Sequence, residues 1–113
     1  MSIALRSRVV DWSGLLTSAR RLATAHEPWV RASEASEYGL DLLAVAEFGG
    51  LSDQQRRILL MQGEMWLVRP RWERSDLIVL LGKQLDTYRL FGLPERIDSE
   101  LAGVIEELRA IAS

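Results

Sequence analysis

The sequence of 113 residues contains no cysteine, a single histidine and a single lysine. The absence of cysteine excludes disulfide bridges, thiol nucleophiles, thiolate zinc sites and iron–sulfur clusters. One histidine without cysteine does not make an ordinary zinc site. We interpret His26 as a residue at a helix end, where it interacts with the helix dipole. The sequence therefore predicts neither a metal nor another cofactor.

Long hydrophobic runs are also missing. No apolar run approaches the ~20 residues that span a bilayer. The segment Met1–Arg6 lacks the basic start, continuous apolar stretch and cleavage site of a signal peptide. Gly49-Gly50 is not followed by the lysine and hydroxyl residue of a phosphate-binding loop. We therefore expect a cytoplasmic protein with no membrane association and no nucleotide site.

The composition is that of one ordinary folded domain. Hydrophobic residues make up 48% of the chain and charged residues 27%, with a formal net charge of −2. This balance is unlike that of disordered chains, and a chain of this length can bury a sufficient core by itself. We expect a single domain over residues 1–113.

Apolar residues recur at helical spacing, and no segment shows sustained strand alternation. Five helices are expected: one across Leu5–Ala23, one from Pro28 or Ser33 to Phe48, one from Ser52 to about Met65, one from Arg74 or Ser75 to Gly92, and one capped by Asp98 or Ser99 that continues through Ile111. Gly14 leaves open a break near the start of the first helix, because glycine costs up to ~1 kcal/mol inside a helix. The predicted fold is an all-α bundle of about five helices.

Acidic residues concentrate in one block. Residues 32–53 contain five acidic residues and no basic residue. Glu34, Glu37 and Asp41 are spaced so that they share a helix face beside Tyr38. Such a face could dock onto a basic partner, because complementary charge speeds encounter and selects partners. The alternative is a solvated face that balances arginines on neighbouring helices.

Four tryptophans are unusual for so small a core. We assign Trp12 to the core because it lies on the apolar stripe of the first helix. Trp29, Trp66 and Trp72 lie near helix ends and the Pro70 loop, with Arg71 next to Trp72. Large aromatic residues beside arginine are typical of binding hot spots. The alternative is that these three tryptophans pack loops onto the bundle.

No constellation of residues predicts catalysis. Glu47 and Glu64 lie in apolar segments and are the candidates for acid–base chemistry, but such residues more often reach solvent. Leu51–Met61 resembles the first helix of a helix-turn-helix domain, although no basic recognition helix follows it. Arg69, Arg71 and Arg74 keep nucleic-acid binding open as a lesser alternative for this mildly acidic chain.

A resemblance to a known family lies in the acidic block. Ser36-Glu-Tyr-Gly-Leu-Asp-Leu-Leu43, followed by Ala44-Val-Ala-Glu-Phe-Gly-Gly-Leu-Ser52, is similar to the small helical immunity proteins of the Maf type. Those proteins carry a comparable Glu-Tyr-Gly-Leu-Ala-Leu helix, in which alanine stands at the position of Asp41. The resemblance implies a bacterial cytosolic inhibitor that blocks a cognate toxin domain by covering its surface.

The sequence thus predicts a protein-binding inhibitor of the immunity or antitoxin type, without enzymatic activity, whose partner is a protein such as a basic toxin domain. The expected contact residues are Trp29, Glu34, Glu37, Tyr38, Asp41, Trp66, Arg71 and Trp72. The main alternative is a homo-oligomeric regulatory or scaffold subunit, such as a homodimer, in which the tryptophan-rich edges bury against a second copy. A nucleic-acid-binding regulator is the lesser alternative.

Overall fold

The computed structural model describes residues 10–48, 50–68 and 72–112, which form five α-helices and contain no strand. The helices are α2 (Trp12–Thr24), α3 (Pro28–Phe48), α4 (Asp53–Val68), α5 (Arg74–Leu90) and α6 (Glu95–Ala112). The prediction of an all-α bundle is confirmed.

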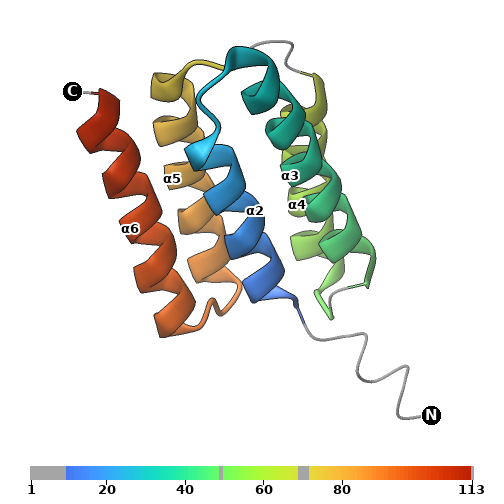
Figure 1. Ribbon diagram of the computed structural model, residues 1–113. Coiled ribbons are helices and arrows are strands. Elements are labelled where there is room, and N and C mark those ends of the chain that lie inside the picture. The colour runs from blue at the N-terminus through green and yellow to red at the C-terminus, as the bar shows by residue number, and fades with distance from the viewer. Residues whose placement is uncertain (1–9, 49, 69–71, 113) are drawn as a thin grey trace.

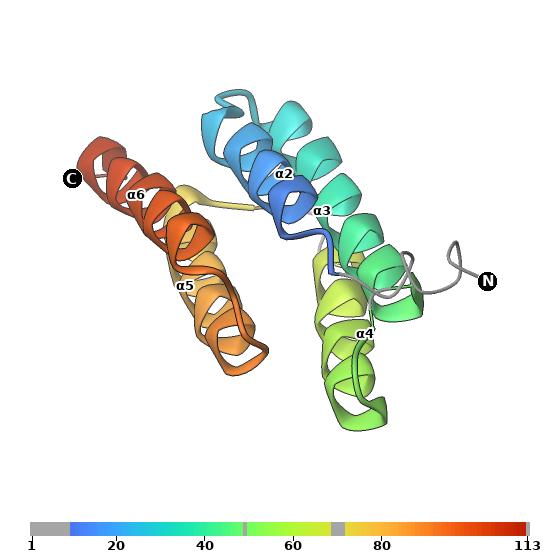
Figure 2. The ribbon, with the colours of Figure 1, turned by 90° about the horizontal axis from the view of Figure 1, so that it is seen from below.

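The helices form two pairs joined by α2. α3 packs along α4, α5 packs along α6, and α2 contacts both α3 and α6 (Figure 1). In the view from below, α5 and α6 lie together on one side of the molecule and α3 and α4 on the other (Figure 2). α4 therefore stands at the edge of the molecule, with α3 as its main neighbour.

Local capping signals set most of the helix starts. The Asp11 carboxylate accepts a hydrogen bond from the Gly14 N–H at 3.0 Å, so the first helix begins at Trp12. The part of the expected stripe before residue 10 lies outside the described residues. The predicted capping box is present: the Ser52 hydroxyl accepts from the Gln55 N–H at 3.2 Å, and the Ser52 N–H donates to the Gln55 side chain at 3.1 Å.

Gly92 ends α5 as predicted, with a φ of +90° that favours glycine. The start of the last helix was predicted wrongly, because α6 begins at Glu95 and not after Asp98 or Ser99. The Asp98 carboxylate does not cap the helix. It accepts two hydrogen bonds from the Arg89 guanidinium, at 2.7 and 2.9 Å, which tie α5 to α6 and lower the pKa of Asp98.

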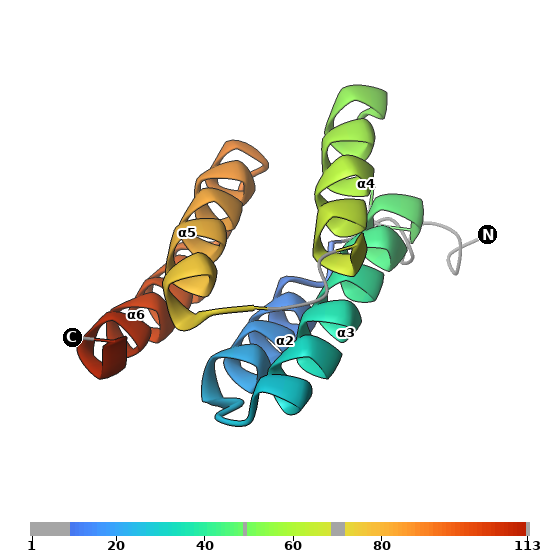
Figure 3. The same cartoon turned by 90° about the horizontal axis from the view of Figure 1, so that it is seen from above.

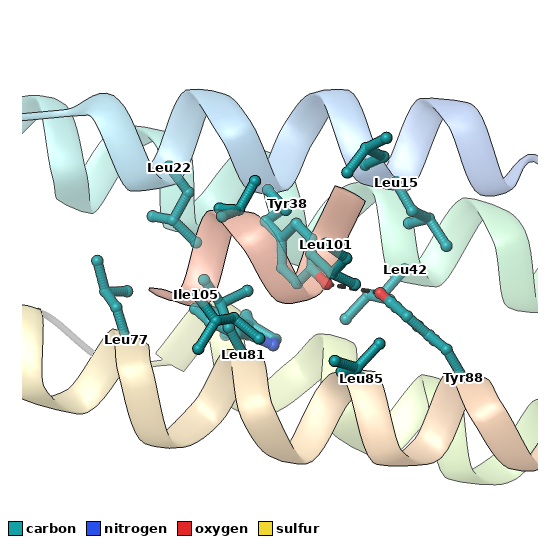
Figure 4. Close-up of a cluster of buried hydrophobic side chains, with 14 of the residues drawn as sticks. Leu15, Leu22, Tyr38, Leu42, Leu77, Leu81, Leu85, Tyr88, Leu101 and Ile105 are labelled. Carbon is teal, nitrogen blue, oxygen red and sulfur yellow. Dashed lines mark hydrogen bonds between the residues drawn. The ribbon is translucent and has the colours of Figure 1, made fainter. Parts of the chain in front are cut away.

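Leucines from every helix pair fill the core (Figure 4). Leu15 and Leu22 of α2 point toward Leu81 of α5 and Leu101 of α6, and Leu42 of α3 belongs to the same cluster. Burial of such side chains stabilises the fold by about 1.5–3 kcal/mol each.

α3 and α4 approach closely where two glycines meet. A carbon atom added at Gly39 would lie 2.8 Å from the carbonyl oxygen of Gly63, and one added at Gly63 would lie 2.8 Å from Leu43. The crossing therefore requires residues without a β-carbon. It holds α3 firmly against α4.

Buried polar groups tie the remaining segments together. The buried Arg31 guanidinium donates to the carbonyl oxygen of Trp72 at 2.7 Å and to that of His26 at 3.2 Å. On the facing sides of α4 and α5, the Gln84 amide donates to Gln62 at 2.7 Å. Figure 3 shows α4 and α5 opposite each other on the same side of the molecule, and this amide contact bridges them.

Candidate binding surface

The three acidic residues expected to share one face differ in their surroundings. Glu37 is exposed, Glu34 is half-buried, and Asp41 is turned toward α2, where its carboxylate accepts a hydrogen bond from the Ser18 hydroxyl. The spacing of the three residues is as expected, but α2 covers the flank of α3 that carries Asp41. Asp41 is therefore bonded within the fold, and Glu37 is the one of these three residues that is fully exposed.

Tyr38 was predicted at the edge of a binding face, and the structure places it in the core. Its side chain has no exposed area, and its hydroxyl lies 2.6 Å from the Tyr88 hydroxyl (Figure 4). Its ring meets the edge of Trp66 with centroids 4.8 Å apart. Because a phenolate is poorly solvated there, burial raises the pKa of both Tyr38 and Tyr88 well above the ordinary value. Tyr38 is a core residue and offers no contact to a partner.

This pair predicts the behaviour of the protein in alkali. The chain has two tyrosines, and both are buried. In the unfolded chain a tyrosine hydroxyl has a pKa of 10.0, and burial raises this pKa in the folded state. The two neutral hydroxyls therefore contribute their full stabilisation below pH 10, and this stabilisation is lost as the pH rises above 10. We expect phenolate absorbance to appear together with loss of the helical circular dichroism, in one transition above pH 10. Phenolate absorbance that rises while the helical signal persists would contradict the buried pair.

Trp66 and Trp72, also expected at the surface, stack on each other inside the bundle. Their ring centroids lie 4.6 Å apart, and the side chains are 2% and 3% exposed. The Trp66 indole N–H donates to Gln84 at 3.2 Å, which satisfies its polar group within the fold. The prediction that these two residues contact a partner is corrected, because both side chains belong to the core. Arg71 lies outside the described residues.

Trp12 packs edge to face against Tyr88, with centroids 5.3 Å apart, at the border of the core. Its assignment to the core is confirmed, although it is only partly buried.

Trp29 alone among the tryptophans is open to solvent, with 72% of its side-chain area exposed. It begins a stripe along the outer side of α3 that is exposed at every position. The members of this α3 stripe are Trp29, Ser33, Glu37, Leu40, Ala44 and Glu47. Successive members are three or four residues apart, so they line up on one face. The stripe combines two apolar anchors with two carboxylates and no basic side chain.

Sequence reasoning had found Trp29 and Glu37 but had missed the other members of the α3 stripe. Leu40 is half exposed, at 50%, and Glu47 is exposed. The sequence suggested Glu47 only as a candidate for acid–base chemistry. The sequence feature that could have pointed to these members is the absence of any basic residue between residues 32 and 53.

The candidates for catalysis are dispersed. Glu47 and Glu64 reach solvent from α3 and α4, and the exposed ring of His26 contacts the Arg74 guanidinium, 3.3 Å from Nδ1. Within residues 10–48, 50–68 and 72–112, no three acidic or histidine side chains gather as a metal site would require. In the same residues no helix is long and apolar enough to cross a membrane.

Comparisons with known proteins give no relatives. No protein-family model, no curated protein sequence and no solved structure matches this chain significantly.

Proposed function

We propose that this protein is a non-enzymatic, protein-binding inhibitor of the bacterial immunity or antitoxin type, which acts in the cytoplasm by covering the functional surface of a basic partner. The observation that carries the proposal is the α3 stripe. It presents Trp29 and Leu40 beside Glu37 and Glu47, all of them exposed.

The α3 stripe is suited to binding because α3 is held on its other sides. Gly39 packs against α4, and Asp41 is hydrogen-bonded to α2. A surface that is already ordered loses little conformational entropy when a partner binds. Trp29 then offers a large rigid anchor, the residue type that contributes most to hot spots.

The negative charges of the α3 stripe favour a partner with a positively charged surface. Two carboxylates in a segment without basic residues favour a partner with clustered lysine or arginine. The segment that resembles Maf-type immunity proteins, residues 36–52, contributes Glu37, Leu40 and Glu47 to the α3 stripe. A basic toxin domain is thus the partner that both the charges and the resemblance favour.

The test is co-expression with the product of the adjacent gene in the native genome. We expect that product to be toxic alone, to be neutralised by this protein, and to co-purify with it. Trp29→Ala should weaken binding by about 10- to 100-fold, as hot-spot truncations do. A Glu37→Lys/Glu47→Lys double variant should slow association and abolish neutralisation.

Leu90→Ala is the matched control, because Leu90 is 82% exposed on α5, away from the α3 stripe. It should neutralise as the wild type does. A monodisperse wild-type protein that recovers no protein partner, or stripe variants that bind as the wild type does, would refute the proposal.

A further inference from the structure

A second apolar surface lies on the outer side of α4. Its members are Ile58, Met61, Met65 and Val68, spaced three or four residues apart. Met61, Met65 and Val68 are 60%, 45% and 77% exposed. These three are neighbours on one helix, whereas exposed apolar residues usually occur singly. We call this surface the α4 stripe.

The α4 stripe points away from the rest of the fold. Gly63 faces α3, and Met61 and Met65 are two residues before and after it. Because each residue turns the helix by about 100°, both methionines lie on the side opposite the α3 contact. Their place on an edge helix leaves the α4 stripe without a neighbour among the described helices (Figure 2). Gln54, Arg57, Ile58 and Met61 line a shallow hollow in its amino-terminal half.

Charged residues border the α4 stripe along one edge. Arg57 and Glu64 are seven residues apart, about two helical turns, so they lie on the same edge. Both are exposed, and among the described residues neither makes an ion pair. The Arg57 side chain donates a hydrogen bond to the Asp53 carbonyl oxygen of its own helix, at 3.5 Å. A complementary partner would place an acidic group beside Arg57 and a basic group beside Glu64.

A second copy of this chain meets that requirement. A two-fold axis perpendicular to α4 brings two α4 stripes face to face in antiparallel orientation, and it keeps the charged edges on the same side. Arg57 of one copy then lies beside Glu64 of the other, twice by symmetry. Parallel pairing about an axis along the helices would instead place the two charged edges on opposite sides of the contact, where Arg57 and Glu64 of the two copies do not meet.

We propose that two copies of this protein associate through their α4 stripes, packed antiparallel, with Arg57–Glu64 pairs at both ends of the contact. In this register Met61 of one copy packs toward Ile58 of the other, at the shallow hollow. The contact differs from the tryptophan-mediated dimer considered above, because Trp66 and Trp72 are buried within each copy. It uses a different helix from the α3 stripe and does not depend on the proposed inhibitor function.

One helix face makes a small interface, so the dimer should be weak. Interfaces below about 1,200 Å² are typical of transient encounters. We expect sedimentation of the purified protein to show a reversible monomer–dimer equilibrium with a dissociation constant of roughly 10 µM to 1 mM. A wild-type protein that stays monomeric throughout this range would overturn the proposal.

Variants separate this contact from nonspecific association. Met61→Glu should raise the dissociation constant at least about tenfold, because each copy would bring a charge into the apolar contact. Arg57→Glu and Glu64→Arg should each weaken the dimer, and the Arg57→Glu/Glu64→Arg double variant should restore it, since the exchanged charges are again complementary.

Arg21→Glu is the matched control for charge, because it makes the same change of charge at an exposed position on α2. It should dimerise as the wild type does. A double variant no tighter than either single variant would refute the antiparallel register. Circular dichroism of each variant should show unchanged helix content, since all these side chains are exposed.

Different variants test the inhibitor function and the dimer, so either proposal can be refuted without the other. Leu40→Glu should impair partner neutralisation and leave dimerisation intact, whereas Met61→Glu should do the reverse. If Met61→Glu instead loses the protein partner while the wild type is monomeric, the α4 stripe binds that partner and the dimer is refuted.

Discussion

Replacing Trp66 with alanine is expected to lower the free energy of unfolding by about 3–5 kcal/mol, the usual cost of truncating a large buried aromatic residue. The ring of Trp66 lies between Tyr38 and Trp72, with centroids 4.8 and 4.6 Å away, and its N–H is bonded to Gln84. The truncation would leave a cavity and would remove the hydrogen bond to the Gln84 amide oxygen, while the Gln84 amide nitrogen still donates to Gln62. Urea denaturation followed by circular dichroism measures the loss.

Trp29→Ala is the matched control, because it removes the same side chain from a position that is 72% exposed. Its effect on stability should stay within about 0.5 kcal/mol. If both variants lost similar stability, the division of the tryptophans into core and surface residues would be wrong.

Gly39→Ala is expected to destabilise the protein by about 1–3 kcal/mol, as overpacking in a tight core does. The added carbon would lie 2.8 Å from the Gly63 carbonyl oxygen and 3.0 Å from the Trp66 side chain. A backbone oxygen cannot move aside without displacing α4. The substitution should therefore push the two helices apart, and the midpoint of urea denaturation should fall.

Gly82→Ala in α5 provides the control, since a carbon added there meets no atom within 4 Å. Alanine is favoured over glycine in a helix by about 0.5–1 kcal/mol, so this variant should be more stable than the wild type. Two alanine variants with shifts of the same sign would contradict the close contact of α3 and α4.

Signals that act within a few residues could be predicted from the sequence. Pro28, the Ser52–Gln55 capping box and Gly92 mark helix ends through bonds or backbone angles that are local. The start of α6 could not be predicted in this way. The carboxylate that suggested a cap, Asp98, is bonded instead to Arg89 in the preceding helix.

The candidate surface was harder to predict, because a residue belongs to it only if no other helix packs over that residue. Tyr38 and Trp66 have polar atoms and resemble surface residues in sequence, but their bonding partners, Tyr88 and Gln84, lie 50 and 18 residues further along the chain. The orientation of Asp41 likewise depends on where α2 lies, which the spacing within α3 does not determine. Sequence periodicity predicts which residues share a face, and helix packing decides which face remains open.

The contacts of Arg31 bear on how freely the sequence around them can vary. Its guanidinium binds the main-chain oxygens of residues 26 and 72, and every amino acid supplies such an oxygen. Substitutions at position 26 should preserve the hydrogen bond from Arg31, provided that the backbone of the turn keeps its conformation. An exchange at position 31 itself would release both loops at once, so a library of random variants should tolerate many residues at 26 and few at 31.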